Sequence, residues 1–156
     1  MKYAGFLIIF SCLINFSCKT KEVVSPNEYE GNRLILSHGG GFAGTYKTYC
    51  LLDNGQLFKG DKQYEATASV KGLKKETVNQ IFSNYDILGL GKEEVDSYGN
   101  LNYSITMINE TGEQHKLNWE KGQKGSEKLQ LFYRNIMNQI RLRNKENKDS
   151  NLEPVK

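Results

Sequence analysis

Two stretches of the chain have the hydrophobic spacing of amphipathic helices. Between Leu73 and Leu88, apolar residues recur at positions i, i+3, i+4 and i+7, which places them on one helical face: Val78, Ile81, Phe82 and Tyr85. After Ser126, which can cap a helix, a second apolar stripe consists of Leu129, Phe132, Tyr133, Ile136, Met137 and Ile140. The sequence therefore predicts two helices, each with an apolar face that must pack against another element.

Strand-like patterns precede the first of these helices. Arg33–Ser37 is rich in branched apolar residues and ends at a glycine cluster, and Thr45–Leu52 is aromatic and β-branched. The Asn54–Gly55 pair then tolerates positive φ in a two-residue hairpin turn, so Leu57–Lys59 is the predicted returning strand. A further extended piece is expected within Glu65–Val70.

A second hairpin is predicted between the two helices, with a turn at Gly112. Its apolar positions alternate with polar ones along both strands: Tyr103, Ile105 and Met107, then His115, Leu117 and Trp119. We predict an α+β fold, with an antiparallel sheet of about five strands and two amphipathic helices packed on one face, in the order β-β-β-α-β-β-α. The predicted core unites Leu117, Trp119, Phe132 and Ile136.

The N-terminus has the pattern of an export signal. Lys2 precedes the apolar run Ala4–Phe16, which is shorter than the roughly 20 residues of a membrane span. Ser17 and Cys18 follow, and this junction resembles the lipobox of bacterial lipoproteins in the looser form familiar from the Bacteroidetes. The resemblance implies lipidation of Cys18 and a position in the cell envelope, anchored to the outer rather than the inner membrane. Two alternatives stay open, namely lipidation of Cys12 and an ordinary cleaved signal peptide.

The ends of the chain differ from its middle in composition. We expect residues 1–17 to be a lipoprotein signal peptide, residues 18–31 a flexible tether and residues 32–143 a single domain. Residues 143–151 contain no apolar side chain, so residues 144–156 are predicted to be a disordered tail.

Composition and charge exclude several functions. The 156 residues suit one domain, and 21 basic against 18 acidic residues are too balanced for a dedicated nucleic-acid binder. Cys50 is the only cysteine beyond residue 18, which leaves no disulfide framework within one mature chain. It is expected to be a small buried residue, as is usual for a lone cysteine.

The motifs that suggest catalysis or cofactors lack their required context. Residues 39–44 spell the dinucleotide-binding fingerprint, but a strand follows them where a helix N-terminus is needed, so no nucleotide is expected. The run from His38 to Gly41 is similar to an esterase oxyanion loop, yet the chain has no Gly-x-Ser-x-Gly nucleophile. His38 and His115 are the only histidines, and nothing in their spacing joins them with Cys50 in a metal site. We therefore predict no catalytic residue, no metal and no cofactor.

The order of features resembles one known family, the emfourin-like proteins, which are small bacterial inhibitors of thermolysin-like metalloproteases. The residues that carry this resemblance are Gly40–Gly44 followed by a strand, Tyr85–Leu90 at a helix end, Asn102–Thr106 in a hairpin with Gly112 and His115, and the terminal helix. The similarity covers roughly residues 33–141. It implies a non-enzymatic binding protein whose partner is a secreted or envelope metalloprotease.

Partner contact is predicted at the glycine-rich connection, that is at Gly40, Gly41, Phe42, Ala43 and Gly44. Two placements are open for Phe42. It packs back onto its own sheet, which we favour slightly, or it projects as an apolar anchor for a partner. The alternative function is an envelope interaction domain with a different protein partner and no inhibitory activity.

Overall fold

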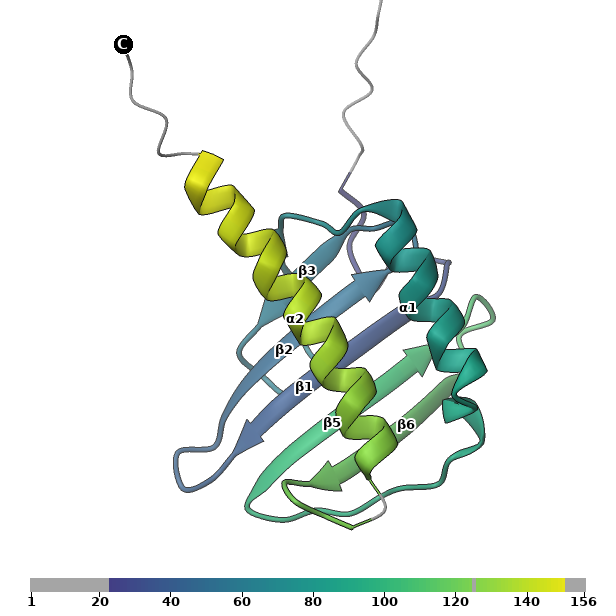
Figure 1. The fold of residues 1–156 in the computed structure, drawn as a ribbon, viewed down its shortest axis with the longest axis vertical. Coiled ribbons are helices and arrows are strands. Elements are labelled where there is room, and N and C mark those ends of the chain that lie inside the picture. Colours follow the sequence, from purple (N-terminus) through teal and green to yellow (C-terminus); the bar gives the residue numbers. More distant parts are fainter. Residues whose placement is uncertain (1–22, 125, 151–156) are drawn as a thin grey trace, which may run out of the picture.

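Both helices lie on one face of a single antiparallel sheet (Figure 1). The computed structural model describes residues 23–124 and 126–150. The strands are β1 (Arg33–Gly40), β2 (Thr45–Leu52), β3 (Leu57–Gly60), β4 (Ala68–Val70), β5 (Leu101–Ile108) and β6 (Gln114–Glu120). The helices are α1 (Lys75–Ile87), the 3₁₀ turn η1 (Leu90–Lys92) and α2 (Glu127–Ser150). Their order along the chain confirms the predicted α+β fold, with six strands rather than five because part of the 65–70 segment forms β4.

The sheet order, β4-β3-β2-β1-β5-β6, places β1 at the junction of two hairpins. β1 pairs along its full length with β2 on one side and with β5 on the other. This double pairing explains why β1 extends to Gly40, three residues beyond the predicted strand, although Gly39 and Gly40 have low strand propensity. Strand β6, the partner of β5, is one edge of the sheet.

The main core lies between the sheet and the two helices. Its fully buried side chains include the four residues that the sequence placed together: Leu117, Trp119, Phe132 and Ile136. Tyr85 of α1 packs edge-on against Phe132 of α2, with ring centroids 6.0 Å apart. The predicted shared core is therefore confirmed.

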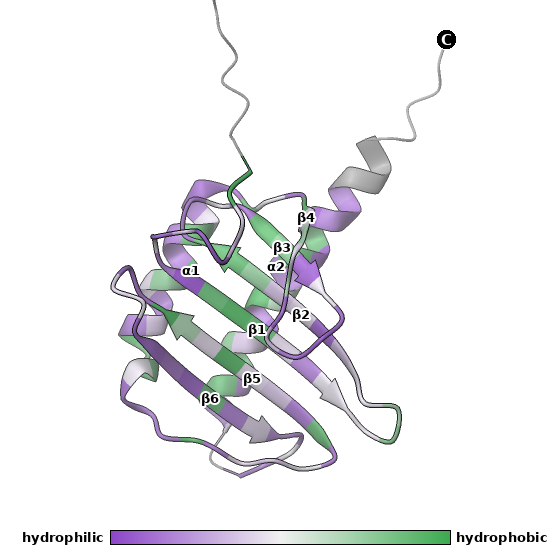
Figure 2. Cartoon of the chain, turned by 180° about the vertical axis from the view of Figure 1, so that it is seen from behind, coloured by the Kyte–Doolittle hydropathy of each residue, from purple (hydrophilic) through white to green (hydrophobic). Residues whose placement is uncertain are grey.

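The segment between β3 and β4 crosses part of the opposite face of the sheet (Figure 2). Tyr64 lies in this segment with a φ of 63°, and its hydroxyl donates to Oδ1 of Asn118 at 2.9 Å. Its backbone N–H donates to the hydroxyl of Ser37 at 3.2 Å, and that hydroxyl is 2.8 Å from the hydroxyl of Thr48. This explains why the polar positions of the central strands are buried rather than exposed to water.

The prediction of a flexible tether is wrong for the described residues that precede β1. Pro26 is buried, and its carbonyl accepts a hydrogen bond from Arg33. The Tyr29 hydroxyl donates to Asp53, whose other carboxylate oxygen accepts from the backbone N–H of Asn32 at 3.0 Å. Burial, together with the Asp53 hydrogen bond, raises the pKa of Tyr29 to about 12. The segment from residue 24 onward therefore packs on the domain, whereas the predicted signal peptide and Cys18 lie outside the described residues.

The predicted boundary at residue 144 is also wrong, because α2 continues to Ser150. The side chain of Arg143 donates to the carbonyl oxygen of Gly72 at 3.1 Å and to Glu146 at 2.8 Å. These contacts stabilise helical turns that carry no apolar stripe. The last part of the predicted tail, residues 151–156, lies outside the described residues.

Candidate partner-binding site

The five residues predicted to contact a partner form the tip of the β1–β2 hairpin. The N–H of Gly44 donates to the carbonyl oxygen of Gly41 at 3.1 Å, which closes the turn. The N–H of Gly41 also donates to the carbonyl oxygen of Asn100 at 2.6 Å and so ties the tip to the segment before β5. Gly40 has a φ of 112°, and a Cβ atom there would lie 2.6 Å from the Asn100 oxygen. Only glycine fits this position without a backbone shift.

Phe42 projects fully into solvent from this tip, with a relative exposure of 111%. The placement that the sequence slightly favoured, with Phe42 packed back onto its sheet, is therefore wrong. A four-residue connection offers Phe42 no surface to fold onto, because it stands beyond the last paired residues, Gly40 and Thr45. Ala43 is exposed beside it.

A second apolar side chain lies near the tip. Leu101 is the register partner of Gly40 across β1 and β5, and it is 43% exposed. Its Cδ2 atom is 3.8 Å from where a Cβ atom of Gly41 would be. Phe42, Ala43 and Leu101 together form what we call the tip patch, which is apolar and contains no charged residue. Aromatic residues, phenylalanine included, are enriched at protein–protein interfaces.

The tip patch and the beginning of the described chain lie at opposite ends of the sheet (Figure 1). The chain enters β1 at Arg33 and reaches the tip eight residues later. At a rise of about 3.3 Å per residue, β1 separates the two ends by about 25 Å.

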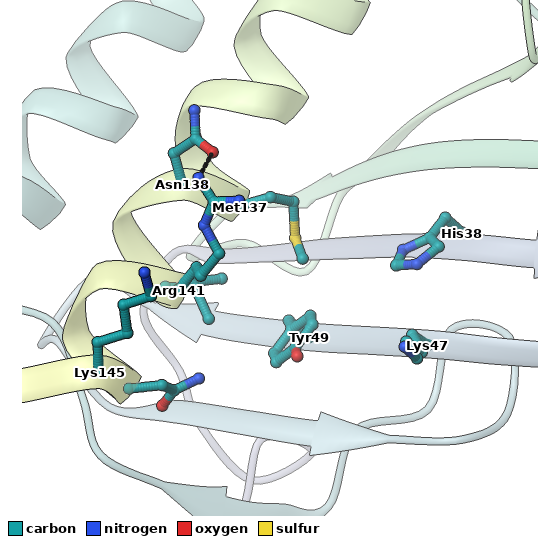
Figure 3. Close-up of a pocket in the computed structure, with 9 residues that line it drawn as sticks. His38, Lys47, Tyr49, Met137, Asn138, Arg141 and Lys145 are labelled. Carbon is teal, nitrogen blue, oxygen red and sulfur yellow. Dashed lines mark hydrogen bonds between the residues drawn. The ribbon is translucent and has the colours of Figure 1, made fainter. Parts of the chain in front are cut away.

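A pocket of about 520 Å³ lies between this hairpin and α2. Figure 3 shows His38, Lys47 and Tyr49 on the strands, and Met137, Asn138, Arg141 and Lys145 on the helix. His38 and Lys47 are register partners on β1 and β2. One wall of the pocket is therefore formed by the β1–β2 hairpin and the other by α2.

His38 is held by aromatic residues at the edge of this pocket. Its Nδ1 atom is 2.6 Å from the hydroxyl of Tyr133, and its ring stacks on Tyr103 with centroids 6.0 Å apart. Tyr103 in turn stacks on Trp119 at 5.7 Å. Burial, and then the nearby charge of Lys47, lowers the pKa of His38 below its usual range. This shift favours the neutral form of the imidazole.

The other residues considered for chemistry are separated and have structural partners. The Nδ1 atom of His115 is 2.7 Å from the Tyr85 hydroxyl, and its Nε2 atom is 3.0 Å from the carbonyl oxygen of Glu93. Cys50 is 2% exposed, which confirms it as a buried residue, and burial raises its thiol pKa to about 12. Trp119 is 0% exposed and belongs to the core. Within residues 23–124 and 126–150, no group of three His, Cys, Asp or Glu side chains could hold a metal ion.

The pocket beside α2 was not predicted from the sequence, although the sequence contains a signal for it. Arg134, Arg141 and Lys145 recur at intervals of seven and four residues, which places them on one flank of a helix. Because residues from 144 onward were predicted to be a disordered tail, the last member of this series, Lys145, was not assigned to the helix.

In the part of the chain that the structure describes, no helix has the length and apolar character needed to cross a membrane. No protein-family model matches the chain, and no curated protein matches its sequence. The candidate site is therefore interpreted from its own geometry.

Proposed function

We propose that this protein is a lipid-anchored, non-enzymatic binding protein of the bacterial cell envelope that inhibits a thermolysin-like metalloprotease through the β1–β2 hairpin. The observation that carries the proposal is the full exposure of Phe42 at a glycine-bounded tip. A large apolar side chain in water is unfavourable for the free protein by roughly 1.5 to 3 kcal/mol relative to burial, and binding into a cleft recovers this free energy.

The local backbone supports insertion into a protease cleft. Gly41 and Gly44 flank Phe42 and Ala43, so no bulky neighbour prevents close approach of the main chain to a partner. Leu101 extends the apolar contact beyond the tip. Inhibition requires only tight occupancy of the cleft, and it needs no catalytic group on this chain.

The position of the tip fits an anchored protein. With lipid on Cys18, the anchor precedes the start of the folded segment by only a few residues. The hairpin tip, about 25 Å away along β1, points away from that end. A protease on the solvent side of the membrane can then reach Phe42 without clashing with lipid.

The test is stoichiometric inhibition of a panel of thermolysin-like proteases by the chain purified in a nonionic detergent. Phe42→Ala should weaken inhibition by about thirtyfold or more, which corresponds to an interface anchor of at least about 2 kcal/mol. Ile87→Ala is the matched control, because Ile87 is 76% exposed but lies on α1. The control should inhibit like the wild type.

Two results would contradict the inhibitor proposal. Equal loss of inhibition in both variants would mean that Phe42 has no special role. The second result is no inhibition of any protease in the panel by a chain whose circular dichroism spectrum shows that it is folded. This result would favour the alternative function, an interaction domain with a different protein partner.

A further inference from the structure

A continuous groove follows one flank of α2. The pocket described above shares Met137 and Asn138 with a second pocket of about 310 Å³ nearer the start of the helix. The second pocket is lined on the sheet side by Tyr103, Trp119 and Lys121. We call the two pockets together the α2 groove. It extends from Gln130, near the start of α2, to Lys145 in its last turns.

The α2 groove is lined by cations and contains no acidic residue. Its charged lining residues are Lys47, Lys121, Arg134, Arg141 and Lys145. None of them forms an ion pair with a described residue. Two other cations of the same helix are paired: Lys128 contacts Glu93, and Arg143 contacts Glu146. In a chain whose basic and acidic residues nearly balance, this separation of charge favours an anionic ligand in the groove.

The floor of the groove is apolar. Tyr49 and Met137 are partly buried against the core, and Ile140, which is 1% exposed, also lines the pocket. His38 lies at the rim, where its Nδ1 atom is engaged by the Tyr133 hydroxyl. The ligand therefore combines negative charge with apolar groups, and its charged atoms face the flank of the helix.

The spacing of the cations matches an extended peptide. At a rise of 1.5 Å per residue, Arg134 and Arg141 are about 10 Å apart along α2, and Arg141 and Lys145 are about 6 Å apart. Extended chains advance about 3.3 Å per residue, so carboxylates on the same side of the segment are separated by about 7 Å when they are two residues apart and by about 13 Å when they are four apart. The separation of Arg141 and Lys145 is close to the first value, and that of Arg134 and Arg141 lies between the two. Alternate side chains of such a segment point to opposite sides, toward the cations and toward the apolar floor.

We propose that the α2 groove binds an extended acidic peptide segment of another protein, with carboxylates interleaved with apolar residues. Single-stranded nucleic acid is the less suitable anion, because its binding relies on aromatic faces that stack with bases. In the groove, Trp119 is 0% exposed, Tyr133 is 6% exposed, and Tyr103 is stacked with both His38 and Trp119. Tyr49 is the one further aromatic residue among the described residues that line the groove, and a single ring is no series of stacking platforms. This inference does not depend on the hairpin tip as an inhibitory element.

The experiment measures fluorescence anisotropy of a labelled eight-residue peptide that alternates glutamate and leucine, titrated with the full chain in nonionic detergent. The glutamate peptide should bind at 0.05 M salt and weaken at least tenfold at 0.5 M salt, since exposed charges are screened over a few ångströms there. A peptide with glutamine in place of each glutamate should not bind.

Two double variants test whether the peptide binds in the α2 groove. The double substitution Arg141→Gln with Lys145→Gln should weaken binding of the glutamate peptide about threefold to tenfold, as expected for two solvent-exposed ion pairs. Lys92→Gln with Lys59→Gln removes the same charge from exposed residues outside the groove and should change binding less than twofold.

Three results would overturn the proposal. Equal effects of the two double variants would mean that peptide binding depends only on the net charge of the protein. Equal binding of the glutamine peptide would remove the role of the carboxylates. Tighter binding of an eight-nucleotide oligothymidylate than of the glutamate peptide would assign the groove to nucleic acid.

Discussion

The two hairpins that meet at β1 and β5 end in different ways, although both lie under the same helices. The β5–β6 turn is polar and is held by Asn109, whose Oδ1 atom accepts from the backbone N–H groups of Thr111 and Glu113 at 3.0 and 2.9 Å. The β1–β2 tip has glycines and an exposed phenylalanine instead. A stable hairpin turn therefore needs no apolar side chain at its tip in this fold. Phe42 is therefore not part of the packing that stabilises the fold.

The hairpins also carry one histidine each, and each histidine contacts a tyrosine hydroxyl of a different helix. His38 of β1 meets Tyr133 of α2, and His115 of β6 meets Tyr85 of α1. The second nitrogen of His115 is also engaged, by the carbonyl oxygen of Glu93. Both ring nitrogens of His115 are thus occupied by structural contacts, whereas His38 borders the α2 groove, which residues of both hairpins line.

The largest expected effect is on the core that supports both hairpins. Phe132→Ala should lower the free energy of unfolding by about 3 to 5 kcal/mol, because Phe132 is 3% exposed and packs against Tyr85. Urea denaturation followed by circular dichroism measures this change. A loss below about 1 kcal/mol would mean that α2 does not depend on this contact with α1 and the sheet.

An added methyl group should destabilise the protein more at the end of β1 than in the β5–β6 turn. Gly40→Ala should cost about 1 to 3 kcal/mol, because the new Cβ atom meets the carbonyl oxygen of Asn100 and φ is 112°. Gly112→Ala adds a methyl group at a φ of 81° with nothing within 4 Å, so it should cost only about 1 to 2 kcal/mol of backbone strain. Thermal unfolding of both variants tests the order, and a more damaging Gly112→Ala would contradict it.

Removing the polar side chain that organises the β5–β6 turn should have a moderate effect. Asn109→Ala deletes the acceptor of the hydrogen bonds from Thr111 and Glu113, and it should cost about 1 kcal/mol because the turn is exposed and water replaces these bonds. Phe42→Ser, at the tip of the other hairpin, should change stability by less than about 0.5 kcal/mol. Equal losses in the two variants would show that both tips serve folding.

Acidification should destabilise the protein through His38. The folded pKa of His38 is lowered, so the unfolded chain binds more protons once the pH falls below about 6.5. The stability that the neutral histidine provides is present above that pH and is lost progressively as the pH falls toward the folded pKa. The melting temperature should therefore drop less between pH 7 and pH 5 in His38→Gln than in the wild type. An identical drop would show that His38 titrates normally.

Local patterns predicted most of the architecture. The predicted strand Thr45–Leu52 is confirmed residue for residue, and α1 lies within the predicted segment from Leu73 to Leu88. The strand was identified by its aromatic and β-branched residues and by the Asn54–Gly55 turn that follows, and α1 by an apolar face that recurs with the helical period. The helical stripe of α2 predicted its buried face equally well.

The errors occurred where long-range contacts override a polar local sequence. Tyr29 lies in a segment without periodicity, and its packing depends on Asp53 in the β2–β3 turn. Arg143 extends α2 by binding the carbonyl oxygen of Gly72, which is 71 residues away. Tyr64 covers the polar face of the sheet from a loop whose sequence gives no sign of that position. Patterns among neighbouring residues in the sequence cannot predict such long-range contacts.

For the candidate site, the sequence identified the glycine-rich connection and Phe42 but not the direction of its side chain. Glycines permit several hairpin geometries, and the exposure of Phe42 depends on how many residues remain unpaired at the tip. The α2 groove was missed because it depends on how α2 is placed against β1, β2 and β5, which the spacing of residues along the chain does not reveal. Its last residues, Asn144 and Lys145, also fell in the predicted tail.

The most direct test of a docking role for the β1–β2 tip is site-specific photo-crosslinking in the native envelope. One chain carries benzoylphenylalanine at Phe42 and the other carries it at Thr111, in the turn between β5 and β6. The account predicts a crosslinked metalloprotease with the probe at Phe42 and no adduct with the probe at Thr111. The same adduct from both positions, or none from Phe42 in a folded and lipidated chain, would contradict the claim that Phe42 contacts the partner.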